Sequence, residues 1–281
     1  EMCIRDRIKS TQDRYPRFRD QQTEQEIPSQ ILKAKDGNPI FCFLACDIPP
    51  LGYKTYLMEL IETMPQYPVR VIAGENKMEN ERYLLQFGED NLLMSIKDKK
   101  LNRELLNGAA GQFIYRWQDN LLNVLDLRKV GKVKSLEFSS GPVFATAKLN
   151  IEDPGNSQAE LIQEIRLYQG LDYIDIINTY NNYQNQSCES RYFAFPFNVP
   201  DFEIWVETPY GKMRPYYDQL PDFAKFYAVS HFVELRSKSE NFSIIWSTKE
   251  APMIELGEIT KKASWTSLNF WPLLYNPGVY P

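Results

Sequence analysis

The chain has 281 residues, of which 43% are hydrophobic and 25% charged, so it is long enough to bury one large core or two ordinary ones. Its 32 basic and 37 acidic residues give a net charge of −5 and are spread without blocks, which excludes the basic stripe of a nucleic-acid-binding protein. The longest apolar stretches, 39–45 and 193–199, are far shorter than the roughly 20 residues that cross a bilayer, so no membrane segment is predicted. A neutral partner such as a sugar fits this composition at least as well.

Both ends of the chain bear on where the natural protein starts and stops. Residues 1–7, E-M-C-I-R-D-R, match the in-frame translation of a transposon-end adapter used in sequencing libraries, so we leave them out of the fold prediction. On this interpretation the natural chain begins further upstream. Residues 276–281 show neither a helical pattern nor a charged tail, which is compatible with truncation at this end too.

The cysteines predict neither a metal site nor a disulfide framework. Cys3, Cys42, Cys46 and Cys188 lack C-x-x-C spacing and are too few to staple a chain of this length. We therefore expect them to be buried thiols.

Aromatic residues, at 14%, and 18 prolines favour strands over helices. Residues 40–46 are apolar at both alternating sets of positions, as in a strand that is covered on both faces. Two prolines and a glycine over 49–52 interrupt this strand with a turn. A second strand is expected over 53–60, and a helix over 55–64 is the alternative, which its Thr and Tyr residues weaken. A proline-containing linker over 66–75 then ends the first domain.

From residue 82 onward, short alternating segments follow one another with turn residues between them. Residues 83–87 and 92–96 flank Gly88-Glu89-Asp90-Asn91, which predicts a hairpin with a four-residue connection. Further strands are expected in an antiparallel meander over 143–149, 161–168 and 173–180, and then over 192–199, 203–207, 242–247 and 253–256.

These elements predict an all-β fold, a large two-layer antiparallel β-sandwich preceded by a small β domain. We assign residues 8–65 to the small domain, which is partial, and 66–75 to the linker. Residues 76–281 form the large sandwich, which is truncated if the natural chain continues beyond residue 281.

The sequence contains no recognisable catalytic or metal-binding motif. His231 is its single histidine, and since no positioned partner is evident, a structural or surface role is expected rather than catalysis. A G-x-S-x-G elbow is absent, and Gly108-Ala109-Ala110-Gly111 lacks the Lys and spacing of a phosphate loop. Pairs such as Asp172 with Asp175, or Glu203 with Glu207, are expected by chance among 37 acids. We therefore assign no catalytic residue, no metal ligand and no cofactor to this chain.

The candidate binding residues lie in the turn-rich segment 208–217 and near the end of the chain. Tyr210 and Arg214 combine an aromatic face with a guanidinium fork, and such groups stack on sugar rings and donate to hydroxyls. Trp271 offers a second aromatic surface. The alternative for all three residues is structural, because they can equally brace the loop or belong to the core.

Several segments resemble, in this order, the C-terminal half of glycoside hydrolase family 38 α-mannosidases, particularly the bacterial ones. The strongest block is Q-E-I-R-L-Y over 163–168, followed by Gly170-Leu171. The tail over 267–271 only loosely matches the Asn-Asn and Trp-rich segment expected there. The other segments are D-I-P-P-L-G-Y-K-T-Y over 47–56, S-I-K-D-K over 95–99, G-P-V over 141–143, F-P-F over 195–197, Tyr210-Gly211 with Arg214-Pro215, and A-P-M-I-E-L-G over 251–257.

This resemblance implies a galactose mutarotase-like sandwich in a retaining enzyme that acts on mannose-containing glycans. In such an enzyme one aspartate attacks the anomeric carbon, a second carboxyl group protonates the leaving oxygen, and zinc grips sugar hydroxyls. The family's zinc is held by two histidines and two aspartates, a set that a chain with one histidine cannot supply. The nucleophile and the zinc are therefore expected in a missing N-terminal catalytic barrel, on which this chain packs as a scaffold.

Two other functions remain open. A self-standing carbohydrate-binding module would bind mannosides through the aromatic residues of 210–217 and would hydrolyse nothing. An aldose epimerase has a related large sandwich, but it needs histidine and glutamate acting together, and only His231 is present.

Overall fold

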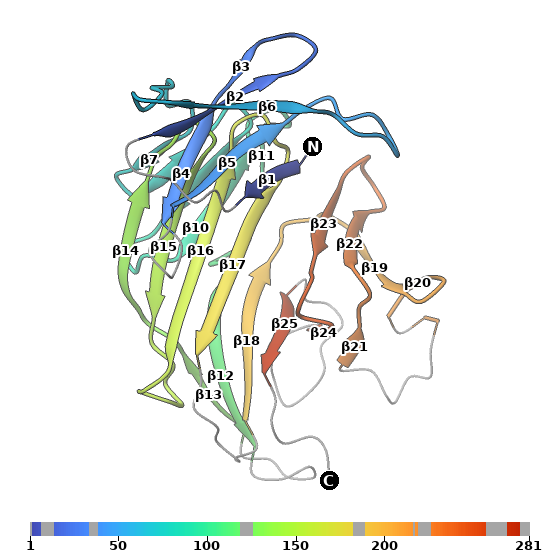
Figure 1. The fold of residues 1–281 in the computed structure, drawn as a ribbon. Coiled ribbons are helices and arrows are strands. Elements are labelled where there is room, and N and C mark those ends of the chain that lie inside the picture. The colour runs from blue at the N-terminus through green and yellow to red at the C-terminus, as the bar shows by residue number, and fades with distance from the viewer. Residues whose placement is uncertain are drawn as a thin grey trace. The chain divides into compact units, whose positions relative to one another are not determined.

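The computed structural model describes residues 2–6, 14–33, 39–118, 126–181, 189–215, 217–218, 226–256 and 269–275. Over these residues the chain forms antiparallel sheets joined by turns and contains no helix, so the all-β prediction is confirmed (Figure 1). It follows that no helix of the described part is long and apolar enough to cross a membrane.

The chain folds into two compact units. Unit 1 is built from described residues within 1–82, 137–148 and 164–177. Unit 2 is built from those within 83–136, 149–163 and 178–281.

Two small sheets pack face to face in unit 1. One has the order β1 (Met2–Asp6), β5 (Pro39–Ala45), β4 (Ser29–Lys33), and the other β3 (Glu26–Ile27), β2 (Tyr15–Asp20), β6 (Tyr56–Ile61). The ring of Phe43 lies 4.7 Å from that of Phe18 and 4.9 Å from that of Tyr56. The predicted strand over 40–46 is β5, whose Phe41, Cys42 and Phe43 are all buried because it is covered on both faces.

Three predictions for this region are corrected. Residues 1–7 were left out of the fold, but Met2–Asp6 forms β1 and pairs with β5 from Met2 opposite Ala45 to Asp6 opposite Phe41. The open edge of β5 offers unpaired backbone groups, which an extended segment within reach satisfies. The strand expected from Tyr53 begins at Tyr56, and the helix considered over 55–64 is wrong, because β6 pairs along its whole length with β2.

Two further sheets contain residues of both units. The first has the order β11 (Arg103–Glu104), β10 (Leu93–Asp98), β9 (Tyr83–Phe87), β8 (Lys77–Glu79), β7 (Ile72–Gly74) and contains the predicted hairpin as β9 and β10. The second has the order β14 (Val133–Ser139), β15 (Phe144–Ile151), β16 (Glu160–Tyr168), β17 (Ile174–Asn181). This second sheet is the predicted meander, preceded by one further strand.

Unit 2 contains a six-stranded and a four-stranded sheet. The larger has the order β13 (Asp126–Val130), β12 (Gln112–Gln118), β18 (Glu189–Pro196), β25 (Asn269–Tyr275), β24 (Met253–Leu256), β21 (Phe226–Ala228). The smaller has the order β20 (Gly211–Met213), β19 (Phe202–Thr208), β22 (Phe232–Ser237), β23 (Ser243–Ser247).

Strand β18 lies at the centre of unit 2 and is buried on both faces from Glu189 to Phe195. On one face Phe193 packs against Phe113 of β12, whose ring in turn stacks 6.4 Å from that of Tyr180 on β17. On the other face Tyr192 and its neighbours form a separate apolar cluster. Every polar side chain on β18 must therefore find its partner inside the protein.

Candidate functional site

The β19–β20 hairpin presents two of the candidate binding residues. Val206 pairs with Met213 and Thr208 with Gly211, so the turn falls at Pro209 and Tyr210. Tyr210 has a φ of 68°, in the left-handed region, and its side chain is fully exposed to solvent. Tyr210 therefore points away from the hairpin rather than bracing it.

Arg214 follows β20 and lies against two aromatic rings. Its guanidinium carbon is 5.3 Å from the ring centroid of Trp205 and 5.3 Å from that of Tyr217. The ammonium group of Lys212 is 4.4 Å from the ring of Trp205. Cations at these distances are attracted by the ring quadrupole, so both basic side chains pack against the indole of Trp205.

Acidic groups hold this surface in place. Asp218 accepts hydrogen bonds from the backbone N–H and the guanidinium of Arg214, which lower the pKa of Asp218 and raise that of Arg214. The indole Nε1 of Trp205 donates to Glu203 at 2.9 Å. We call Glu203, Trp205, Lys212, Arg214 and Tyr217 the Trp205 platform. It combines an aromatic face with donors and acceptors for hydroxyl groups.

The structure separates the three predicted binding residues. Arg214 is part of the Trp205 platform, whereas Tyr210 at the neighbouring turn faces solvent. Trp271 lies on β25 opposite Glu255, and its side chain is outside the described part of the chain. Trp205 was missed, although the alternation of Glu203, Trp205 and Glu207 places an aromatic ring among acids on one face of a strand.

His231 lies one residue before β22. Its side chain is 78% exposed, and its Nδ1 is 3.1 Å from Glu207 Oε2. The partner that the sequence did not reveal is therefore a carboxylate on β19. The pair lies at the surface, where water screens it.

The four acids considered as chance pairs each have a partner of their own. Asp172 forms an ion pair with Arg82, and Asp175 accepts from the hydroxyl of Tyr168 at 2.6 Å. Glu203 is bound by Trp205 and Glu207 by His231. Neither pair is arranged as two carboxyl groups that share a ligand.

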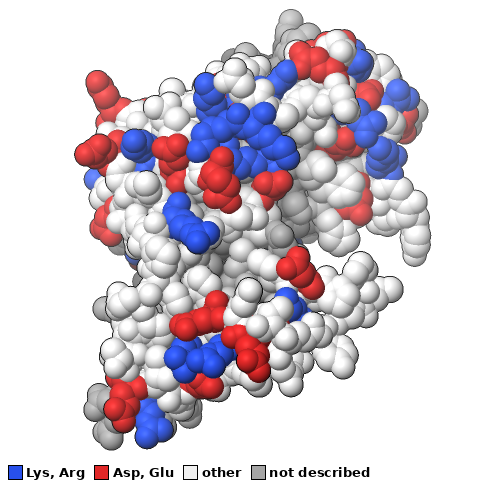
Figure 2. Space-filling model, turned by 90° about the horizontal axis from the view of Figure 1, so that it is seen from above, with Lys and Arg blue, Asp and Glu red and all other residues white. Residues whose placement is uncertain are grey.

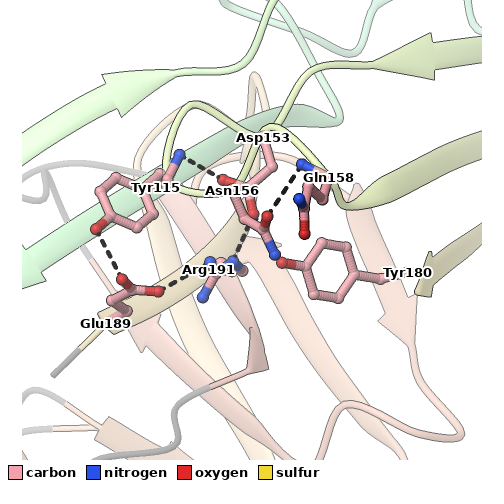
Figure 3. Close-up of polar contacts among 8 residues, drawn as sticks. Tyr115, Asp153, Asn156, Gln158, Tyr180, Glu189 and Arg191 are labelled. Carbon is pink, nitrogen blue, oxygen red and sulfur yellow. Dashed lines mark hydrogen bonds and ion pairs between the residues drawn. The ribbon is translucent and has the colours of Figure 1, made fainter. Parts of the chain in front are cut away.

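A second polar cluster, the Arg191 network, lies in the interior of unit 2 (Figure 3). The side chain of Arg191 is 0% exposed, and its Nε donates to Asp153 Oδ2 at 2.7 Å. Its Nη2 lies 2.9 Å from Glu189 Oε2. Figure 3 shows the guanidinium between these two carboxylates, with an aromatic ring on either side.

Those rings belong to Tyr115 and Tyr180, which also bind the carboxylates. The hydroxyl of Tyr180 donates to Asp153 at 2.7 Å, and that of Tyr115 donates to Glu189 at 3.1 Å. Burial, followed by the charge of Glu189, raises the pKa of Tyr115 to about 12. Burial and the hydrogen bond to Asp153 raise the pKa of Tyr180 as well.

The ionisation of Arg191 reflects a balance within the network. Burial alone would lower its pKa, but the hydrogen bond and charge of Asp153 more than offset this, so the pKa is raised. Asp153 also accepts the backbone N–H of Gly155 at 2.8 Å, which fixes the turn after β15. Both carboxylates of the network therefore face internal donors.

The opposite face of β18 carries another buried ion pair. Arg116 of β12 is 4% exposed, and its Nη1 donates to both carboxylate oxygens of Glu255 on β24, at 3.3 and 3.2 Å. Tyr192 lies beside this pair, and burial followed by the charge of Glu255 raises its pKa. Arg191 and Tyr192, which are consecutive residues of β18, thus lie at ion pairs on opposite faces of the same sheet.

One family model, described as glycosyl hydrolases family 38 C-terminal domain, matches residues 78–249, which is more than half of the chain. The chain belongs to glycosyl hydrolase family 38. The resemblance of the ordered motifs to the C-terminal region of this family is thereby confirmed. A search of curated proteins found no significant match.

The matched part of this family 38 chain contains the Arg191 network and the Trp205 platform. They differ in access. A substrate cannot reach Arg191 or Asp153, which are 0% and 2% exposed, whereas the side chain of Arg214 is 41% exposed. The network is therefore structural, and the platform is the candidate for binding.

The zinc implied by family 38 does not fit the residues of this chain. The expected set needs two histidines, and the single histidine is exposed and bound to Glu207. Within the described residues, no group of three or more His, Cys, Asp or Glu side chains is arranged to hold a metal ion. We assign no step of a reaction to a metal in this chain.

The Arg191 network predicts a large loss of stability on Arg191→Met. The substitution leaves Asp153 and Glu189 buried without their cation, which costs about 3–5 kcal/mol of unfolding free energy. Urea denaturation of the 281-residue chain measures this. The matched control is Lys238→Met, which removes a 52% exposed partner of the 57% exposed Asp201 and costs little stability, because water screens exposed ion pairs.

If R191M does not fold, adding Asp153→Asn should recover part of the stability, because Asn removes one of the two buried negative charges and still accepts from Gly155. Equal unfolding midpoints for R191M and K238M would show that the Arg191 network does not stabilise the fold more than an exposed ion pair does.

Proposed function

We propose that this chain is the C-terminal part of a retaining α-mannosidase that acts on mannose-containing glycans, and that it serves as a scaffold for catalytic residues lying outside it. The observation that carries the proposal is the family 38 match over residues 78–249 in a chain with one histidine. The ordered motifs point to the α-mannosidases within the family.

The chemistry of the reaction supports a scaffold role for this chain, with the catalytic residues outside it. A retaining glycosidase needs two carboxyl groups about 5–5.5 Å apart that flank the scissile bond, one as nucleophile and one as acid. In unit 2 the buried acids Asp153, Glu189 and Glu255 are held by arginines and tyrosines and are closed to solvent. Acids engaged in this way hold the sandwich together and are not free to attack a sugar.

The first test is hydrolysis of an aryl α-mannoside. The 281-residue chain should release no more aryl alcohol than buffer does. The product of the gene extended upstream of Ile8 should hydrolyse the same substrate, lose this activity with a chelator and regain it with zinc.

Hydrolysis by the 281-residue chain alone would contradict the scaffold proposal. An inactive extended product that carries a barrel with intact acids and histidines would contradict the assignment as an α-mannosidase.

A carbohydrate-binding module is the second candidate, and the Trp205 platform is the observation that favours it. An indole flanked by Lys212, Arg214 and Glu203 can stack on a sugar ring while charged groups bind its hydroxyls. This function does not need a catalytic barrel.

The platform predicts binding of mannose oligomers by the 281-residue chain. Calorimetric titration should give a Kd of about 1 mM or lower, and Trp205→Ala or Arg214→Ala should weaken it about tenfold, equivalent to about 1.4 kcal/mol. Tyr53→Ala is the control, because Tyr53 is 85% exposed in unit 1, outside the platform. Absence of heat with every mannose oligomer would exclude the binding module.

A further inference from the structure

The four-stranded sheet of unit 2 carries a row of side chains that runs across its strands (Figure 1). Trp205 of β19 lies opposite Glu234 of β22, and Glu234 lies opposite Ile245 of β23. Residues that lie directly opposite each other in an antiparallel pair share one face of the sheet. The row therefore begins at the Trp205 platform and ends on β23, the last strand in the order β20, β19, β22, β23.

The face that carries this row is open to solvent. Successive residues of a strand point to opposite faces, so Val206 and Val233 lie on the face away from Trp205. Both valines are 0% exposed, whereas Ile245 in the row is 63% exposed. We call the face that carries Trp205 and Ile245 the outer face of this sheet.

The two ends of the row are too far apart for one sugar ring to touch both. Neighbouring strands lie about 4.8 Å apart, so the two steps from Trp205 to Ile245 amount to about 10 Å. Trp205 offers an aromatic surface at one end, and Ile245 offers an aliphatic surface at the other. A ligand that uses both surfaces must contain more than one ring.

Polar groups lie beside the row on the same face. Glu203 is opposite Arg236, and Arg236 is opposite Ser243. The guanidinium of Arg236 is held by Glu234, whose Oε1 accepts from Nε at 2.9 Å and lies 2.8 Å from Nη2. Because hydroxyl groups both donate and accept, a hydroxyl-rich ligand on the row would find partners of both kinds in fixed positions.

The charges of the outer face balance one another, so a neutral ligand fits it better than a polyanion, which needs a surplus of basic groups. The view in Figure 2 shows a similar mixture, because its largest group of Lys and Arg is bordered by Asp and Glu. The cations of the outer face are Lys212, Arg214 and Arg236, and its anions are Glu203, Glu207 and Glu234.

We propose that the outer face binds a linear mannose oligomer laid across the strands, with one sugar against the Trp205 platform and a later sugar against Ile245. This inference rests on the carbohydrate binding proposed above and assigns its ligand as an oligomer rather than a single sugar. The apolar C–H groups of a sugar ring can pack on Ile245, and a sheet holds the two contacts at a fixed spacing.

The test is calorimetric titration of the 281-residue chain with mannose and with α-linked mannose oligomers of increasing length. The affinity should rise at least about fivefold from mannose to the trisaccharide, because the longer ligand also buries Ile245. Ile245→Ala should bind the trisaccharide no more tightly than mannose. Trp205→Ala should weaken the binding of every ligand, mannose included.

Two further variants make the test specific to Ile245. Ile72→Ala is the matched control, because Ile72 is 59% exposed and lies on β7, the last strand of another sheet. I72A should keep the full gain with ligand length. Ile245→Trp enlarges the apolar surface and should strengthen trisaccharide binding about threefold. Both Ile245 variants should melt within about 2 °C of the wild type, because this side chain is exposed.

The outcomes separate this inference from the proposed binding. Absence of heat with every mannose ligand would contradict both. Binding that does not strengthen with ligand length, or an I245A chain that keeps the gain, would overturn the inference alone. Loss of the gain in I72A as well as in I245A would also overturn it, because the effect would then not depend on the outer face.

Discussion

Arg191 is fully buried in unit 2, and the elements around it must supply partners for its charge. Removing a guanidinium from water costs several kcal/mol even after relaxation. The fold offsets this cost by placing two carboxylates beside the guanidinium of Arg191. Asp153 comes from the turn after β15, and Glu189 comes from β18 itself. Tyr115 and Tyr180 then hold those carboxylates from β12 and β17. One cation thereby ties together elements of the six-stranded sheet and of the β14–β17 sheet.

The elements of the fold could be predicted from local pattern, since strands reveal themselves by alternation and turns by their residues. The two apolar faces of β5 and the turn between β9 and β10 were visible in this way. Contacts between residues far apart in the sequence could not be predicted from local pattern. The sequence around Asp153 predicts only the start of a turn. The folded chain brings Asp153 into contact with Arg191, which lies 38 residues later. Likewise, β1 forms by pairing with the edge of β5, and the sequence of β1 alone does not predict that pairing.

The candidate site was predicted in part. Arg214 could be singled out because an arginine among aromatic residues in a turn-rich segment is a recognisable pattern. Its ring partner Trp205 lies nine residues earlier, on the neighbouring strand, and the register of β19 with β20 was needed to bring them together. His231 shows the same limit, because its partner Glu207 is 24 residues away.

The structure thus divides into a closed interior and open surfaces. Charges in the interior of unit 2 lie close to opposite charges, which suits a scaffold, whereas Lys212 and Arg214 of the Trp205 platform lie at the surface. In an α-mannosidase of family 38, such a domain would stabilise and complete a site whose reacting carboxylates it does not supply.

Covalent trapping of the nucleophile tests this account most directly. A retaining enzyme treated with an activated 2-deoxy-2-fluoro mannoside accumulates a glycosyl-enzyme ester on its nucleophile. Peptide mass mapping of the labelled extended product should place the sugar on an acid outside the 281 residues. A label on any Asp or Glu of the 281 residues would contradict the account, because the chain would then carry the reacting carboxylate itself.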